Sequence, residues 1–149
     1  MNDQRTRQET VGPTAEGSPP LDPAGLLGER IEGRYYVVEC IGQGGMGVVY
    51  RARQTSLSRS VAIKVLPRKL RDDPKALARF EREARGISRL EHPNVVSVYD
   101  FGRTDGLAYL CMEYLRGRPL GDRVREGPMP VEAFGPVASQ IVDGVDRKS

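Results

Sequence analysis

The sequence of 149 residues contains no tryptophan, a single histidine and only two cysteines. Cys40 and Cys111 lie in separate apolar segments, so they form neither a CxxC pair nor the spaced framework of a disulfide-rich domain. We expect both to be small, buried hydrophobic residues. His92 has no cysteine or second histidine near it in the sequence, which argues against a zinc site. We therefore expect no metal to be held by protein ligands alone.

Long hydrophobic runs are also absent. No stretch of about 18 apolar residues, the length needed to cross a bilayer, occurs in the sequence. The first ten residues are polar and partly acidic, so they lack the apolar core of a signal peptide. We expect a cytoplasmic protein with no membrane segment, and its length has room for one ordinary domain with its own core.

The formal net charge of +3 is unevenly distributed along the chain. Residues 1–34 contain four basic and six acidic side chains, whereas residues 35–149 contain nineteen and fourteen. Much of the basic surplus lies between Arg68 and Arg89, where both signs alternate at helical spacing. This pattern is typical of a solvated helix face. Because no aromatic residues interleave these charges to stack on bases, we expect no nucleic-acid partner.

Composition divides the chain into three parts. Residues 1–29 are rich in Pro, Gly, Thr and Glu and have few large apolar residues, which predicts a disordered tail. Regular structure is expected to begin near Tyr35, with three antiparallel strands at 35–41, 48–53 and 61–66. A helix is expected from Pro74, because acidic residues and proline favour a helix start. Its apolar stripe recurs every three or four residues: Ala76, Phe80, Ala84, Ile87 and Leu90.

Two more strands are expected at 95–99 and 107–114, joined by a turn that contains glycine. The pattern then becomes helical, with a short helix at 119–125 and a longer one from Pro130. Pro136 is expected to kink the longer helix or delay its start. One face of that helix is apolar: Phe134, Val137, Ala138, Ile141, Val142 and Val145. The predicted fold class is α+β, with a five-stranded antiparallel sheet and one packed helix.

A glycine-rich segment at residues 42–49 fits the pattern G-x-G-x-x-G-x-V. Glycines let backbone amides approach phosphate oxygens closely. A dinucleotide-binding motif would continue into a helix, but β-branched Val48 and Val49 follow here. The Gly-Lys-Ser/Thr ending of a P-loop is absent. A hairpin that only needed positive φ angles would use one or two glycines, whereas this one has four in six residues.

Two charged residues stand in apolar surroundings. Lys64 is the only charge in the run Val61–Leu66, and such a run is typical of a strand covered on both faces. Glu83 lies on or beside the apolar stripe of the first helix. A buried ammonium and a buried carboxylate each need a partner, so we expect the two to meet. The open alternative places Lys64 with its head in solvent and Glu83 at the rim.

Four motifs occur in a fixed order: the glycine-rich hairpin, Val61-Ala62-Ile63-Lys64, Arg82-Glu83-Ala84 and His92-Pro93-Asn94-Val95-Val96. In this order they resemble the bacterial, eukaryotic-like Ser/Thr protein kinases over about residues 30–145. The resemblance implies that residues 30–115 form the ATP-binding amino-terminal lobe. It also implies that residues 116–149 are the hinge exit and the first helices of the carboxy-terminal lobe.

The resemblance also implies roles for single residues. Lys64 would bind the α- and β-phosphates of ATP, and Glu83 would hold Lys64 in place. Met112 would be the gatekeeper, while the backbone of Glu113 and Leu115 would bind the adenine edge. The implied ATP-binding set is Ile41, Gly42, Gln43, Gly44, Gly45, Met46, Gly47, Val48, Val49, Ala62, Lys64, Met112, Glu113 and Leu115.

The resemblance further implies a catalytic loop H-R-D-x-x-x-x-N and a metal-binding D-F-G. No histidine and no asparagine occur after Tyr114. Asp100-Phe101-Gly102 precedes the hinge, so we interpret it as turn chemistry at the end of a strand. We therefore expect no catalytic residue and no metal ligand in this chain, and Mg²⁺ only in a complete kinase domain. The chain is expected to be a truncated kinase that is inactive alone.

Three classes stay open at this point: a partial kinase, a non-catalytic nucleotide-binding regulatory module, and an interaction domain that keeps the fold. The apolar face of the last helix is expected to remain uncovered. Such a face favours self-association or a partner protein. The sequence does not identify the protein substrate.

Overall fold

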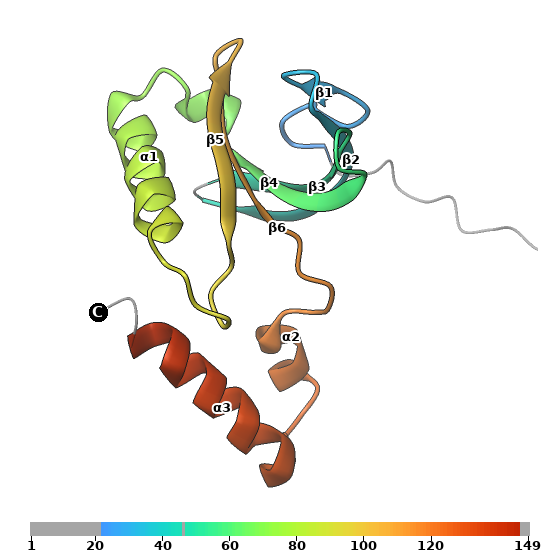
Figure 1. Ribbon diagram of the computed structural model, residues 1–149, viewed down its shortest axis with the longest axis vertical. Coiled ribbons are helices and arrows are strands. Elements are labelled where there is room, and N and C mark those ends of the chain that lie inside the picture. The colour runs from blue at the N-terminus through green and yellow to red at the C-terminus, as the bar shows by residue number, and fades with distance from the viewer. Residues whose placement is uncertain (1–21, 46, 147–149) are drawn as a thin grey trace, which may run out of the picture.

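The computed structural model describes residues 22–45 and 47–146. One antiparallel sheet has the strand order β1-β2-β3-β4-β6-β5, with α1 beside it and α2 and α3 beyond one end (Figure 1). The elements are β1 (Arg30–Ile31), β2 (Tyr35–Gly44), β3 (Gly47–Gln54), β4 (Arg59–Val65), a 3₁₀ turn (Arg68–Leu70), α1 (Pro74–Ser88), β5 (Val98–Thr104), β6 (Leu107–Glu113), α2 (Leu120–Arg125) and α3 (Val131–Asp146).

The predicted α+β class is confirmed, and the sheet has one strand more than expected. The additional strand is β1, whose two residues pair with Tyr35 and Tyr36 of β2. The helix predicted from Pro74 is also confirmed. The Asp73 carboxylate accepts a hydrogen bond from the Lys75 amide at 2.9 Å and so caps α1. Because α1 ends at Ser88, Leu90 of the predicted stripe lies beyond it.

The strand predicted at 95–99 was placed too early, since β5 spans Val98–Thr104. Asp105 and Gly106 both have positive φ, and they form the two-residue turn that joins β5 to β6. Asp100-Phe101-Gly102 therefore lies within a strand, and its interpretation as a turn was wrong. Two segments here contain the Asp and Gly residues that favour turns, 100–102 and 105–106, and only the second forms a turn.

The two faces of the sheet carry separate cores. Side chains of β6 alternate between them, as expected for a strand. Tyr109 and Cys111 belong to the larger core, whereas Leu110 belongs to the smaller core that α1 covers. Both cysteines were expected to be buried; Cys111 is buried and Cys40 is half-buried. Burial raises the pKa of the Cys111 thiol.

Residues 22–29 pack on the sheet, so the expected disorder is wrong for this part of the tail. The Asp22 carboxylate accepts hydrogen bonds from the Leu26 and Leu27 amides and from the Tyr50 hydroxyl, at 2.9, 3.1 and 2.8 Å. Ala24 is buried, and its amide donates to the Tyr50 hydroxyl at 3.0 Å. Residues 1–21 of the predicted tail lie outside the described residues.

The two expected helices near the end of the chain are present. Pro136 lies within α3 and does not delay its start. The carboxy-terminal part of α3 approaches the loop before β5, since a Cβ on Gly144 would lie 3.2 Å from the Asn94 carbonyl oxygen. Much of the apolar face remains exposed, including Phe134, Ile141 and Val142. None of the helices in residues 22–45 and 47–146 is long and apolar enough to cross a membrane.

Candidate nucleotide site

The glycine-rich segment forms the closed end of the β2–β3 hairpin, where Gly44 pairs with Gly47. Gly47 has a φ of 157°, which residues with a Cβ rarely adopt. A Cβ at this position would lie 2.9 Å from the Val65 carbonyl oxygen and 3.2 Å from Cε of Lys64. The end of the hairpin therefore approaches the Lys64 side chain as closely as a glycine allows. Met46 lies outside the described residues.

Lys64 and Glu83 meet, as their positions in the sequence predicted. The Lys64 Nζ atom on β4 lies 2.7 Å from Oε1 of Glu83 on α1. The Lys64 side chain is 16% exposed and that of Glu83 is 33% exposed, so the pair is shielded but still reachable from solvent. The alternative of two independent solvated side chains is wrong. A cation held in place beside open backbone suits a phosphate group.

Phe80 is a neighbour of this pair that the sequence did not reveal. Its ring lies under the Lys64 ammonium, with Nζ 5.9 Å from the ring centroid. Phe80 is also buried, and its ring packs against that of Phe101 at 6.1 Å. The sequence placed Phe80 on the apolar stripe three residues before Glu83. That spacing was the available signal, because residues i and i+3 share a helix face.

The other expected residues lie on β2, β3, β4 and β6, except for Gly45 in the hairpin turn and Leu115, which follows β6. Val49 is paired with Lys64, and Ala62 is paired with Met112. Ile41 and Leu115 are exposed. Val48 was expected in the ATP-binding set, but its side chain is buried in the larger core. Only its backbone can take part in a site on the Lys64 side.

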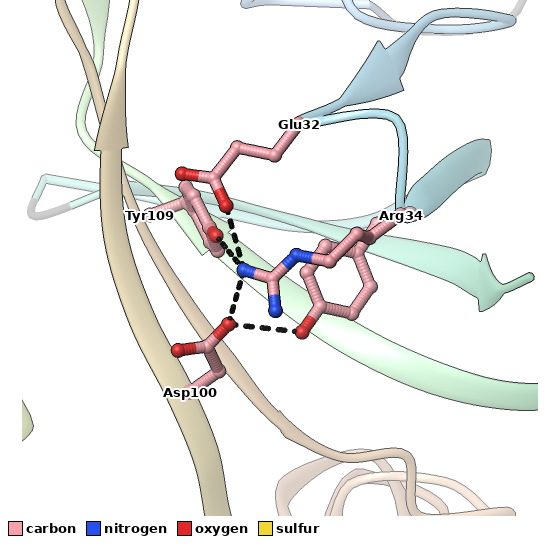
Figure 2. A network of polar contacts seen from close by, with 5 residues as sticks. Glu32, Arg34, Asp100 and Tyr109 are labelled. Carbon is pink, nitrogen blue, oxygen red and sulfur yellow. Dashed lines mark hydrogen bonds and ion pairs between the residues drawn. The ribbon is translucent and has the colours of Figure 1, made fainter. Parts of the chain in front are cut away.

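Asp100, the acidic residue of the D-F-G sequence, belongs to a polar network on the other side of the sheet (Figure 2). Its Oδ2 atom accepts hydrogen bonds from Arg34 at 2.7 Å and from the Tyr35 hydroxyl at 3.1 Å. Arg34 also donates to Glu32 at 2.6 Å and to the Tyr109 hydroxyl at 2.9 Å. Burial raises the pKa of Tyr35 and of Tyr109, so both hydroxyls stay protonated. Asp100 links the sheet to the turn before β2.

Gly102 of the same motif has a packing role. A Cβ at this position would lie 2.5 Å from the Tyr109 ring, so only glycine leaves room for that ring. Within residues 22–45 and 47–146, no group of three or more His, Cys, Asp or Glu side chains is placed to hold a metal ion. The contacts of Asp100 and Gly102 explain this D-F-G sequence without a metal.

Comparison with known proteins assigns the fold to a known family. The model of the protein kinase domain matches residues 35–147. Among solved structures, the PknI kinase domain of Mycobacterium tuberculosis is similar, with a TM-score of 0.63 and 27% sequence identity. That alignment covers 76% of this chain and 47% of the solved one.

Two bacterial relatives are similar over most of this chain. The chain is 43% identical over 122 residues to the serine/threonine-protein kinase PrkC of Bacillus subtilis. It is 43% identical over 121 residues to the serine/threonine-protein kinase pkn3 of Myxococcus xanthus. Each alignment covers 80% of this chain, but only 19% and 22% of the respective relative. The chain therefore spans about a fifth of the length of these relatives.

Proposed function

The chain belongs to the protein kinase family and spans part of a Ser/Thr protein kinase domain, and we propose that its residues 30–115 bind ATP. The observation that carries the proposal is the pair of Lys64 and Glu83, 2.7 Å apart and beside the glycine-rich hairpin. A fixed ammonium neutralises phosphate charge, and hairpin amides approach the phosphate oxygens where no side chains intervene.

The same proposal assigns the adenine end of the nucleotide to the same face of the sheet as Lys64, farther from the closed end of the hairpin. Ile41 and Val49 cover the base, with Ala62 and the gatekeeper Met112 beside it. The backbone of Glu113 and Leu115 hydrogen-bonds the adenine edge. Residues 116–146 follow as the exit from this hinge and the first helices of the second lobe.

We propose that the complete kinase domain transfers the γ-phosphoryl group of ATP to Ser or Thr. Mg²⁺ supplies charge neutralisation between the phosphates in this chemistry. The described residues do not fit a magnesium site, since Asp100 is bonded to Arg34 and Tyr35. The residues that orient the attacking hydroxyl and hold the metal do not occur among the residues after Tyr114, so this chain alone is expected to bind ATP weakly and not to turn it over.

Titration with a fluorescent ATP analogue tests the proposal. We expect measurable binding to the chain, and a loss of about tenfold or more in Lys64→Ala, because the phosphates lose a charge-assisted contact. Gly44→Val is expected to weaken binding by adding a side chain to the hairpin. Lys69→Ala, which removes an exposed lysine outside the site, is the matched control. Binding that is unaffected by both Lys64→Ala and Gly44→Val would place the nucleotide elsewhere.

A further inference from the structure

Helix α1 has two opposite faces with different chemistry. Ala76, Phe80 and Ala84 are buried and face the sheet. Arg82 and Arg85 of α1 and Arg89, the C-cap residue directly after it, follow one another at spacings of three and four residues, and all three are exposed. By helical geometry, this row lies on the side of α1 that is turned away from the sheet. The helix therefore presents a row of guanidinium groups to solvent.

The three arginines border a shallow groove of ≈ 480 Å³. Glu81 also lines it, together with Ala78 and Gly86, which both lack a long side chain. A Cβ on Gly86 would meet nothing within 4 Å, so the groove is open at this point. Long basic side chains around two small residues form a concave surface rather than a uniform ridge.

The lining of the groove contains one acidic side chain, that of Glu81, against three arginines. Glu83 forms an ion pair with Lys64 of β4. Glu81 lies 3.7 Å from Arg85 and 3.8 Å from Arg103 of β5, so its charge is shared between two cations. Among the residues that the structure describes, no carboxylate lies within ion-pair distance of Arg82 or Arg89. The face carries charges of both signs, as the sequence suggested, but three arginines against one glutamate leave the groove with an excess of positive charge.

We propose that this groove, bordered by Arg82, Arg85 and Arg89, is a docking surface for an acidic segment of a partner protein. Guanidinium groups bind carboxylates in a bidentate geometry, and an exposed row of them is complementary to neighbouring Asp or Glu residues. The row extends over about two helical turns, or about 10 Å. An extended peptide covers that length with about three residues.

Two other polyanions fit the groove less well. Single-stranded nucleic acid binds to basic grooves that also offer aromatic rings for stacking, and the residues that line this groove include no aromatic side chain. A helix that lies on a membrane inserts its apolar face, but the apolar face of α1 is packed against the sheet. An acidic peptide requires only the three guanidinium groups and the open surface at Ala78 and Gly86. This inference does not depend on the proposed nucleotide site.

Binding of a labelled peptide of eight glutamates to the full chain tests the proposal, with fluorescence anisotropy as the readout. The triple variant Arg82→Gln, Arg85→Gln, Arg89→Gln is expected to lose about tenfold in affinity, because each exposed ion pair contributes modestly and three are removed. The matched control Arg30→Gln, Arg53→Gln, Arg125→Gln removes the same charge from exposed arginines on other elements. It is expected to lose less than about twofold.

Hydrogen exchange on the unmodified chain gives a second measurement that needs no variant. Addition of the peptide is expected to slow exchange within α1 and to leave α2 unchanged. Equal loss of affinity in both triple variants would overturn the proposal, because binding would then follow net charge alone. Tighter binding of an oligothymidylate of equal charge, or of vesicles containing phosphatidylserine, would overturn the assignment of an acidic protein segment. The ATP-analogue titration is expected to be unchanged in the triple variant, so failure of either proposal is recognised separately.

Discussion

Because Gly47 has no side chain, the end of the glycine-rich hairpin can lie close to Lys64. The Gly47→Ala variant is expected to lower the free energy of unfolding by about 1–3 kcal/mol, because the new methyl group would lie 2.9 Å from the Val65 carbonyl oxygen at an unfavourable φ. Urea denaturation without nucleotide measures this. Gly44→Ala is the matched control, since a Cβ there would meet nothing within 4 Å. Equal stability of the two variants would show that the close approach at Gly47 is not maintained in solution.

Residues that carry an unexpected charge were the ones the sequence located correctly. Lys64 and Glu83 each interrupt an apolar pattern, and a shielded charge requires a partner. Phe80 and Gly102 gave no such signal. The role of Phe80 on α1 depends on the approach of Lys64 from β4, and the role of Gly102 on β5 depends on the approach of the Tyr109 ring from β6. The sequence alone does not show that Phe80 lies next to Lys64, or that Gly102 lies next to the Tyr109 ring.

The segment of residues 22–29 stabilises the sheet through Asp22. Burial alone would raise the pKa of the Asp22 carboxyl, but hydrogen bonds from the Leu26 and Leu27 amides and the Tyr50 hydroxyl outweigh it, and the pKa is lowered from its usual value. Asp22→Ala is expected to lower the free energy of unfolding by about 1–3 kcal/mol at pH 7, because the buried Tyr50 hydroxyl loses its acceptor.

This contribution depends on pH in a defined direction. The folded state favours the charged carboxylate, so the contribution is fully present above the unfolded pKa of about 3.9 and is lost as the pH falls through the lower folded value. Urea denaturation between pH 7 and pH 3 is expected to show the difference between Asp22→Ala and the unmodified chain shrinking only below about pH 4. Asp143→Ala, at an exposed position of α3, is the control. A difference that grows on acidification would contradict the account.

Most strands and helices followed from local patterns, but β1, the packed segment of residues 22–29 and the bounds of β5 did not. The β-branched residues of β2, β3 and β4 and the proline at the start of α1 predicted these elements near their observed bounds. The packing of residues 22–29 was missed because the prediction used the average composition of residues 1–29. That average does not show that Asp22 accepts hydrogen bonds from the following backbone amides or that Ala24 is buried. The beginning and end of β5 were missed because Asp100 and Gly102 resemble a turn, whereas tertiary contacts keep both within the strand.

At the scale of the molecule, α2 and α3 leave an apolar groove open. The groove has a volume of ≈ 650 Å³ and is lined by residues such as Val124, Phe134 and Val142. Each large apolar side chain gains about 1.5–3 kcal/mol on full burial, so covering this surface is favourable. We expect the chain to self-associate through it at micromolar concentrations.

Sedimentation velocity over a concentration series measures this association. The double variant Phe134→Ser, Val142→Ser is expected to shift the chain toward monomer, while Glu132→Gln at an exposed polar position of the same helix is not. A chain ending at Arg118 should be monomeric with a similar melting temperature. A monomeric full chain that melts well above this shorter one would show that α3 docks within the sequence itself.

The central claim is that Lys64 and Glu83 act together in a nucleotide site, and a double-mutant cycle on ATP-analogue affinity tests it most directly. Lys64→Ala and Glu83→Ala are each expected to weaken binding, Lys64→Ala by about tenfold. Because Glu83 acts through Lys64, the double variant should bind within about twofold of Lys64→Ala, a coupling of about 1 kcal/mol. Nucleotide affinity that is unchanged in both single variants, or effects that simply add, would contradict the account.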